Sequence, residues 1–280
     1  MVTGHKKTKG IPPSKHGQPF LRWAGSKRKL VPKLSAYYGR DLNRYIEPFV
    51  GSASLFFDVM PKRAVLGDIN RELIFTYREV KYRLSDVLRE LGKLRRSKKT
   101  YNRLRKLNVQ SLTRAQRAAR FIYLNRFCFN GIHRTNIKGE FNVPYSGEKT
   151  GRLPSRELLE NCSRLMRGSR FVAGDFGKTL AHARAGDFVY MDPPFYVESK
   201  RVFKEYNGVP FSGKDIQRLR DWMVRLDRKK ITFLVSYAKC KEARTLSKGF
   251  RTQQVTVRRS IAGFSKHRHR SREQLITNIS

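Results

Sequence analysis

The sequence predicts an α/β fold with an open, mostly parallel sheet and an inserted subdomain. Short apolar runs alternate with stretches of helical periodicity along most of the 280 residues. Three of the apolar runs end in an acidic residue, and the middle of the chain breaks the alternation. Alternating strands and helices are typical of α/β proteins with a parallel sheet.

Three apolar runs have the length of buried parallel strands, and each ends in a carboxylate. They cover residues 45–47, 64–68 and 188–192, and their last residues are Glu47, Asp68 and Asp192. In an open, doubly wound sheet the carboxyl ends of the strands form the edge where ligands bind. We therefore expect the three carboxylates to lie along one binding edge.

Helical periodicity fills the segments between these strands. Apolar residues recur at three- and four-residue spacing in residues 52–60, 70–94 and 212–228. This spacing predicts amphipathic helices that pack against the sheet.

The middle of the chain, residues 98–151, departs from this rhythm. Two short basic helical patterns come first, and a turn-rich segment follows them. Asn130-Gly131 and Lys138-Gly139, flanked by aromatic and β-branched residues, predict hairpin turns. We interpret this region as an inserted basic subdomain.

Composition indicates a polyanionic partner. The chain has 61 Lys and Arg against 22 Asp and Glu, a formal net charge of +39, and a charge of this sign and size attracts phosphate. The alternative is a solvated surface or a generally basic proteome. Cys128, Cys162 and Cys240 lack the spacing of a zinc site or a disulfide framework, so we expect reduced thiols and no metal. No signal peptide or membrane span is predicted, which indicates a cytoplasmic protein.

Asp192-Pro193-Pro194-Phe195 is the sharpest candidate for chemistry. Two prolines cannot continue a ladder of strand hydrogen bonds, so they force a rigid turn that holds a carboxylate, a carbonyl and an aromatic face together. Asp192 and the Pro193 carbonyl could accept both N6 hydrogens of adenine, freeing the nitrogen lone pair to attack a methyl sulfonium, while Phe195 stacks on the base. The alternative is an ordinary turn that terminates a strand.

A glycine-containing loop after the first strand is the candidate cofactor site. Residues 47–52 open a helix, and Gly51 allows close approach of a ligand, while Asp68 can take ribose hydroxyls. The sequence lacks the three-glycine dinucleotide fingerprint, which disfavours a nicotinamide cofactor. Trp23 and Lys27 belong to a compact upstream loop, and taken alone this segment is better interpreted as a tryptophan that anchors the N-terminal segment to the core than as a ligand site.

Together these segments resemble the Dam-type DNA adenine-N6 methyltransferases, of the D12 class and alpha group, over residues 20–278. The resemblance implies a Rossmann-like S-adenosylmethionine-dependent methyltransferase fold with a helical and hairpin target recognition insertion. It divides the chain into a flexible basic arm (1–19), a cofactor-binding half (20–95), the insertion (96–152) and a catalytic half (153–280). The implied activity is methyl transfer from S-adenosyl-L-methionine to N6 of a flipped adenine.

The resemblance also assigns roles to individual residues. The catalytic tetrad is Asp192, Pro193, Pro194 and Phe195. The residues implied to bind the cofactor are Trp23, Lys27, Glu47, Phe49, Gly51, Asp68, Asp175, Phe176 and Asp192. The residues implied to bind DNA are Asn125, Arg126, Asn130, Arg134, Lys138, Arg258, Arg259, Lys266, Arg268 and Arg270.

Two positions depart from the family pattern. Phe195 stands where the family more often has tyrosine, which keeps stacking, loses a hydroxyl and is expected to reduce catalysis without abolishing it. Tyr237 stands where many relatives have asparagine. His267 and His269 lie among cations, so we interpret them as part of a phosphate-binding loop and not as metal ligands.

The expected partner is double-stranded DNA, with no membrane and no metal, in the cytoplasm and in contact with the nucleoid. An RNA adenine-N6 methyltransferase is an alternative, because the charge and the catalytic turn do not distinguish the two sugars. A catalytically silent nucleic-acid-binding protein is a second alternative. The recognised bases and a companion restriction endonuclease stay open, with a GATC-like palindrome implied only by the resemblance.

Overall fold

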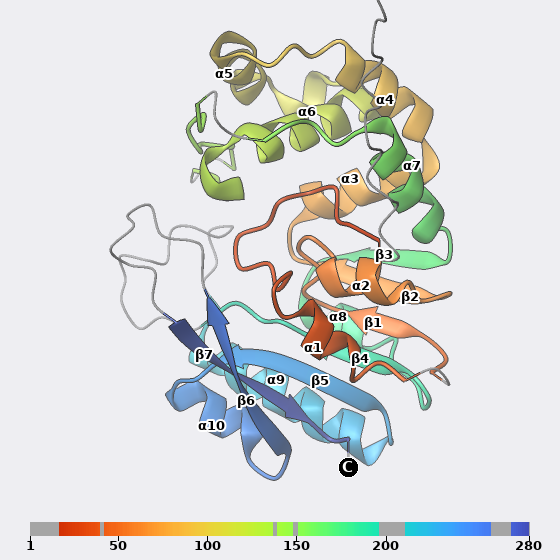
Figure 1. The fold of residues 1–280 in the computed structure, drawn as a ribbon, viewed down its shortest axis with the longest axis vertical. Coiled ribbons are helices and arrows are strands. Elements are labelled where there is room, and N and C mark those ends of the chain that lie inside the picture. The colour runs from red at the N-terminus through yellow and green to blue at the C-terminus, as the bar shows by residue number, and fades with distance from the viewer. Residues whose placement is uncertain are drawn as a thin grey trace, which may run out of the picture.

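A computed structural model describes residues 17–39, 42–136, 139–147, 151–195, 211–258 and 270–279, and these residues form a seven-stranded sheet in the order β3-β2-β1-β4-β5-β7-β6 (Figure 1). The strands are β1 (Tyr45–Glu47), β2 (Ala64–Asp68), β3 (Ser169–Ala173), β4 (Phe188–Met191), β5 (Thr232–Ala238), β6 (Arg251–Arg258) and β7 (Arg270–Thr277). Strands β1 to β5 pair in parallel. The predicted α/β fold with a mostly parallel sheet is confirmed.

The two C-terminal strands run against the others. β7 pairs antiparallel with both β5 and β6, and its register runs from Thr277 opposite Leu234 to Glu273 opposite Ala238. Because β5 is parallel to β4, the beginning of β7 lies at the edge where the parallel strands end.

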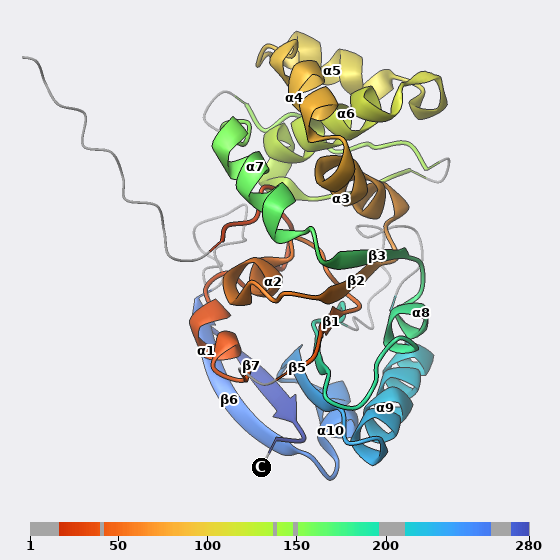
Figure 2. The same ribbon diagram turned by 90° about the vertical axis from the view of Figure 1, so that its right-hand side faces the viewer.

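Ten α-helices occur in the described residues. They are α1 (Val31–Ser35), α2 (Ser54–Val59), α3 (Arg71–Tyr82), α4 (Leu84–Gly92), α5 (Lys98–Lys106), α6 (Arg114–Phe127), α7 (Arg156–Leu165), α8 (Phe176–Leu180), α9 (Gly213–Arg228) and α10 (Lys241–Ser247). Figures 1 and 2 show α3 to α7 gathered at the β3 end of the molecule and α9 and α10 at the opposite end.

Strand alternation divides the core between the two faces of the sheet. Tyr45 packs in one cluster with side chains of α2, α3 and α7, whereas its neighbour Ile46 packs in another with side chains of α8, α9 and α10. Successive strand side chains point to opposite faces, so short apolar strands covered on both sides bury every residue.

The predicted helix over residues 70–94 is two helices. Asn70 caps α3, its side chain accepting a hydrogen bond from the Leu73 amide, and the chain turns at Arg83, where φ is −135°. The turn brings α4 against α6, and the apolar periodicity continues on both sides of it. Periodicity alone therefore gives no sign of the break.

The inserted segment has a core of its own. Tyr101 and Leu104 of α5, together with Tyr123 and Phe127 of α6, pack against Val143 in a cluster separate from the two faces of the sheet. This packing explains why the basic helical patterns here do not need the sheet to cover their apolar sides.

One of the two predicted hairpin turns has a different role. Thr135 and Phe141 form an antiparallel bridge around the turn that contains Gly139, as expected for a hairpin. At Asn130-Gly131 both residues have positive φ and reverse the chain, but Cys128 before the turn pairs with Tyr145. That prediction of a hairpin was wrong, because a distant segment provides the pairing partner.

The three cysteines are free, and Cys128 and Cys162 are buried. Burial raises the pKa of Cys128 to about 11 and that of Cys162 to about 12. None of the described helices combines the length and apolar character needed to cross a bilayer.

Candidate functional site

Four acidic side chains lie at the carboxyl edge of the sheet. Glu47 ends β1, Asp68 ends β2, Asp192 follows β4, and Glu273 lies near the start of the antiparallel β7. The order of strands reverses between β1 and β4, which places Glu47 and Asp192 on either side of the switch point. Open α/β sheets bind their ligands in the crevice at this point.

Asp192 is fixed by a cation and a hydroxyl. Lys27 Nζ lies 2.8 Å from Asp192 Oδ1, and Ser236 Oγ donates a hydrogen bond of 3.0 Å to the same oxygen. Ser236 lies on β5, and the Tyr190 and Ser236 hydroxyls are 2.9 Å apart. The side chain of Asp192 keeps 19% exposure. The carboxylate is thus oriented from two directions and still reachable from outside.

Lys27 is a nearly buried cation between two acids. Its side chain is 8% exposed, and Nζ lies 3.6 Å from Glu273 Oε2 as well as beside Asp192. Nζ also lies 5.1 Å from the centre of the Phe195 ring. Buried charges need such partners. The sequence predicts Lys27 to bind cofactor, and the structure brings it to the predicted catalytic acid.

Glu273 is the member of this group that sequence reasoning missed. The other acids were found because each ends an apolar run, whereas Glu273 precedes the apolar residues of its strand. In an antiparallel strand the beginning lies at the carboxyl edge of its parallel neighbours, so the position of the acid within the strand is reversed.

The proline turn presents an aromatic ring beside Asp192. Pro193 is buried, Pro194 is exposed, and Phe195 is half-buried with its ring edge-to-face against Tyr237 at 5.5 Å. Among the described residues, none donates a hydrogen bond to the Pro193 carbonyl. Tyr237, one of the departures from the family pattern, therefore packs against the other, Phe195.

The predicted cofactor loop is held tightly around Gly51. Gly51 has a φ of +43°, and a Cβ added there would lie 2.7 Å from Trp23 Cδ1. The Gly51 amide donates to Asp68 Oδ2 at 3.0 Å, and the Tyr77 hydroxyl donates to the Gly51 carbonyl at 2.8 Å. Both the conformation and the close approach of the indole require glycine.

Asp68 and Glu47 are buried carboxyls with distinct partners. Asp68 also accepts a 2.9 Å hydrogen bond from the Asn70 amide, and burial raises its pKa to about 6 despite these backbone hydrogen bonds. Glu47 accepts a hydrogen bond from the Tyr45 hydroxyl at 3.0 Å. Burial raises the pKa of Glu47 well above its usual value, and the charges of Asp192 and Asp68 raise it further.

Two predicted cofactor aromatics meet on the other side of the loop. The rings of Phe49 and Phe176 lie 5.4 Å apart, and Arg218 covers Phe176 at 4.7 Å. Asp175 accepts a hydrogen bond from the Gly177 amide at the start of α8 and forms an ion pair with Arg218 at 2.7 Å. The aromatic pair offers an apolar surface, whereas the Asp175 carboxylate caps a helix.

His133 connects this site to the inserted segment. Its ring stacks on Trp23 at 6.0 Å and packs against Phe121 and Phe141 of the insertion. Its Nδ1 lies 3.1 Å from the side-chain nitrogen Nδ2 of Asn70, and the backbone N–H of Asn70 donates a hydrogen bond to Asp68. A histidine in an insert gives no sequence signal for this bridge.

Two residues predicted to bind DNA are tied to the protein backbone. Asn125 is 4% exposed. Its side-chain amide accepts a hydrogen bond from the Arg22 backbone N–H at 2.9 Å and donates one to the Arg22 backbone carbonyl at 2.6 Å. Arg126 donates to the carbonyl of Arg152 at 2.9 Å. Burial lowers the pKa of Arg126, and the neighbouring Arg22 lowers it further. The Asn125 side chain therefore holds the backbone next to Trp23, whereas the Arg126 side chain bonds mainly to the Arg152 carbonyl and lies 3.5 Å from the Phe20 carbonyl.

Other predicted DNA residues face outward or fall outside the described chain. Asn130 is half-buried beside Phe129, which is 44% exposed, and Arg134 is half-buried and donates to Asn142 at 2.9 Å. The predicted residues whose positions are not described are Lys138, Arg259, Lys266 and Arg268. Arg258 and Arg270 end β6 and begin β7, and only their backbones are described.

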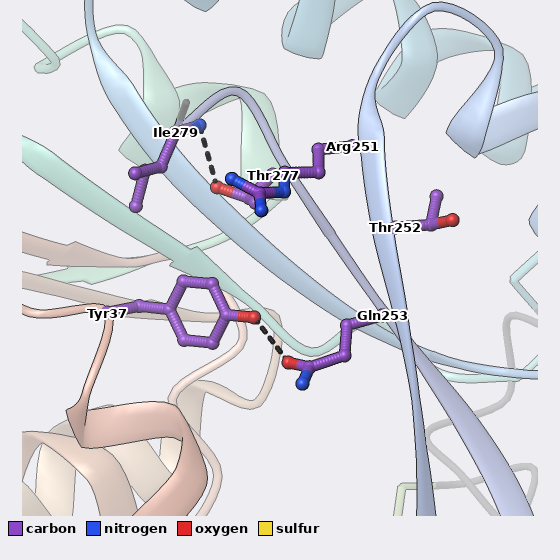
Figure 3. Close-up of a pocket in the computed structure, with 6 residues that line it drawn as sticks. All are labelled: Tyr37, Arg251, Thr252, Gln253, Thr277 and Ile279. Carbon is purple, nitrogen blue, oxygen red and sulfur yellow. Dashed lines mark hydrogen bonds between the residues drawn. The ribbon is translucent and has the colours of Figure 1, made fainter.

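A hollow of about 380 Å³ lies at the opposite edge of the sheet from these acids. It is lined by Tyr37, Arg251, Thr252, Gln253, Thr277 and Ile279, and the Tyr37 hydroxyl donates to Gln253 across it at 2.7 Å (Figure 3). Thr277 pairs with Leu234 near the start of β5, so the hollow is at the amino edge. It contains no acid and belongs to a different part of the molecule.

Within the described ranges, no three His, Cys, Asp or Glu side chains are grouped closely enough to hold a metal ion. The buried acids of the carboxyl edge are instead partnered by Lys27, by hydroxyls and by backbone amides.

Comparison with known proteins gives consistent matches. A family profile described as D12 class N6 adenine-specific DNA methyltransferase matches residues 23–261. The chain is 34% identical to Type II methyltransferase M1.LlaDCHI of Lactococcus lactis subsp. cremoris, covering 93% of this chain and 95% of the relative. It is 31% identical to a DNA adenine methylase of Haemophilus influenzae, covering 91% and 92%. A DNA adenine methylase of Escherichia coli is 30% identical, covering 89% and 90%.

Proposed function

This chain belongs to the D12 class of N6 adenine-specific DNA methyltransferases, and we propose that it transfers the methyl group of S-adenosylmethionine to an adenine extruded from duplex DNA at the carboxyl edge of its sheet. The observation that carries the proposal is the fixed group of Asp192, Lys27, Ser236 and Phe195 beside the Gly51 loop.

The residues around Gly51 fit the methyl donor. Because Gly51 has no side chain, the Trp23 indole packs directly against the loop, and the loop and the indole together would form one wall of the cofactor site. Asp68 would receive the ribose hydroxyls, and Phe49 with Phe176 would hold the adenine ring. The bound donor supplies an electrophilic methyl group on a sulfonium sulfur.

Asp192 and the Pro193 carbonyl orient the attacking nitrogen. The N6 lone pair of adenine is delocalised into the ring, so the nitrogen is a poor nucleophile. When both N–H groups donate hydrogen bonds to fixed oxygens, the lone pair is directed away from the ring. Lys27 and Ser236 keep the Asp192 oxygen in place before the base arrives, so no reorganisation is needed during the reaction.

Phe195 holds the extruded base. Tyr237 meets the Phe195 ring edge-to-face, which leaves ring orientation fixed although the ring lacks the hydroxyl of the more frequent tyrosine. Extrusion is required because N6 cannot be attacked in line inside the stack, and its cost of a few kcal/mol is offset by stacking and phosphate contacts. Asn130 and Arg134, on the outward side of the insertion, would contact the DNA.

The two alternatives make different demands. An RNA adenine methyltransferase would use the same turn, but the recognition insertion favours duplex DNA. A silent binding protein would not need a preorganised Asp192 between a buried lysine and a hydroxyl. A companion restriction endonuclease and a GATC-like palindrome remain expectations from the family.

Sequencing of modified bases tests the proposal directly. DNA from cells expressing the protein should contain N6-methyladenine at one short motif, and cells expressing Asp192→Ala should contain none. Methylation by the variant at the wild-type level, or modification of RNA alone, would overturn the proposal. The same experiment identifies the recognised bases.

A further inference from the structure

Residues 91–139 contain fourteen Lys and Arg and no Asp or Glu. The preceding acid, Glu90, forms an ion pair with Lys93, and the following one, Glu140, bonds to Asn136. All 22 acidic residues of the chain lie outside this run of 49 residues, so acids are absent here although they occur throughout the rest of the chain. The charge of residues 91–139 is therefore of one sign.

Four of these cations form one face of α5, which we name the α5 basic face: Lys98, Lys99, Arg103 and Lys106. At 3.6 residues per turn the four positions fall within an arc of about 140° around the helix axis. The buried Tyr101 and Leu104 occupy the other side, where they pack on α6 and on Val143. Packing of the helix thus forces the four cations outward, and all four are exposed.

Within the part of the chain that the structure describes, the α5 basic face has no acidic partner, unlike other cations of the same region. Arg114 and Arg117 of α6 form ion pairs with Glu79 and Glu72 of α3, and Arg120 donates to the Leu104 carbonyl. By contrast, no described acidic side chain lies within ion-pair distance of the α5 basic face. On α9 the cations alternate with acids, as Arg218 does with Asp215.

The α5 basic face lies beside the segment predicted to contact DNA. The Tyr101 hydroxyl donates to the Val143 carbonyl at 2.9 Å, and the Tyr101 and Tyr145 rings lie 5.2 Å apart. Tyr145 bridges to Cys128, directly before Phe129 and Asn130. In Figure 1, α5 and this segment lie on the same side of the molecule, whereas α9 lies at the far end.

We propose that the α5 basic face binds the phosphate backbone of the DNA duplex outside the base pairs that the enzyme recognises. The inference rests on the proposed function, since it assumes a duplex held at the carboxyl edge. Four neighbouring cations repel one another, and a phosphate backbone with one charge per ~1.7 Å of duplex supplies the missing counter-charge. The surface has no aromatic platform for single strands, which favours a duplex over an unpaired strand.

The test compares two variants that lose equal charge. One carries K98Q, K99Q, R103Q and K106Q, and the matched control carries K214Q, R225Q, R228Q and K229Q on exposed positions of α9 and its C-terminal cap. Affinity for a duplex of roughly 30 base pairs, about three helical turns, is measured by fluorescence anisotropy over a range of salt concentrations.

The α5 variant should reduce the slope of log affinity against log salt by about 3 to 4, because each phosphate contact contributes about 0.9. The control should keep the wild-type slope. On a duplex shortened to the recognised site, the α5 variant and wild type should have the same affinity and the same salt dependence. A variant with K98R, K99R and K106R should also behave as wild type.

Three results would overturn the inference: an unchanged slope in the α5 variant, an equal loss in the α9 control, or a loss that persists on the short duplex. A larger loss on an A-form RNA duplex would assign the surface to RNA instead. Single-turnover methylation at saturating DNA should be unchanged in the α5 variant. If wild type shows no methylation while the slopes differ as expected, the proposed function fails and the phosphate contact stands.

Discussion

The carboxyl edge of the sheet and the inserted segment place opposite charges in opposite environments. Glu47, Asp68 and Glu273 are buried and Asp192 is mostly so, each beside a lysine, a hydroxyl or a backbone amide. The α5 basic face is exposed and unpaired among the described residues. The partners at the carboxyl edge hold the carboxylates in fixed positions, whereas the exposed cations of α5 can attract a polyanion over a longer distance.

The difference in burial determines which charges contribute to the stability of the fold. A buried charge that loses its partner costs several kcal/mol, whereas an exposed ion pair contributes between zero and about 1 kcal/mol. Changes at the carboxyl edge should therefore affect catalysis and folding, and changes on α5 should affect only DNA affinity and its salt dependence.

The largest effect should come from Asp192→Asn, which keeps the size of the side chain and removes its charge. We expect kcat to fall by about 10²–10³-fold, the range seen when one fixed polar group at a reacting centre is removed. Affinity for DNA should stay within about twofold, because the α5 basic face is untouched. Single-turnover methylation and anisotropy separate the two quantities. Near-normal turnover would contradict the role of Asp192. An equal loss of DNA affinity would mean that the carboxyl edge also contributes to DNA binding, against the separation of the two regions.

How far the sequence predicts this division depends on the residue. The carboxylates that end β1, β2 and β4 are recognisable because apolar parallel strands have a simple pattern and a known binding edge. Glu273 is not recognisable, because the direction of its strand relative to the others is a property of the fold. The ion pair between Lys27 and Asp192 joins residues 165 positions apart, and no local pattern encodes it.

The insertion was predicted as a basic region, but individual roles in it were not separable. Asn125 and Arg126 look like surface residues beside a turn, yet Asn125 bonds to the Arg22 backbone and Arg126 to the Arg152 carbonyl. Burial along a helix follows from which neighbours cover it, and α6 is covered by both α4 and α5. The sequence therefore identifies the region and not the contacts.

Loss of the buried cation should have the next largest effect. Lys27→Ala leaves Asp192 and Glu273 without their shared partner, and we expect the free energy of unfolding to fall by about 3 kcal/mol. Arg156→Ala, which breaks an exposed pair with Glu160, should change it by less than about 0.5 kcal/mol. Urea unfolding measures both. Equal effects of the two substitutions would mean that the carboxyl edge is no more sensitive than the surface.

Asp68 should give the carboxyl edge a pH-dependent stability. Its pKa is about 6 in the folded protein, compared with about 4 in an unfolded chain. Between these two pH values Asp68 binds more protons in the folded state than in the unfolded state. The contribution of Asp68 to the free energy of unfolding is therefore largest below about pH 4 and is lost as the pH rises through about 6. The fall should amount to about 2 to 3 kcal/mol, since each pKa unit corresponds to about 1.4 kcal/mol.

Asp68→Asn cannot titrate and removes this dependence. The difference in unfolding free energy between wild type and the variant should therefore change by that amount from pH 4 to pH 7, in the direction of a less stable wild type. Denaturant unfolding at several pH values measures it, and parallel curves for the two proteins would contradict the assignment. Substitutions on the α5 basic face should leave the curve unshifted.

The smallest effect expected at the carboxyl edge is that of Trp23→Ala on cofactor binding. The indole lies against Gly51 and stacks on His133, so its removal loosens the loop without deleting a charge. We expect S-adenosylmethionine affinity to fall about tenfold, equivalent to about 1.4 kcal/mol, and Trp23→Phe to lose less because a ring still covers Gly51. Isothermal titration calorimetry measures both variants, with thermal unfolding to verify the fold. Because His133 belongs to the insertion, a Trp23→Ala variant that binds cofactor normally but loses DNA affinity would show that the indole serves the insertion, and the boundary between the two regions would have to be moved to Trp23.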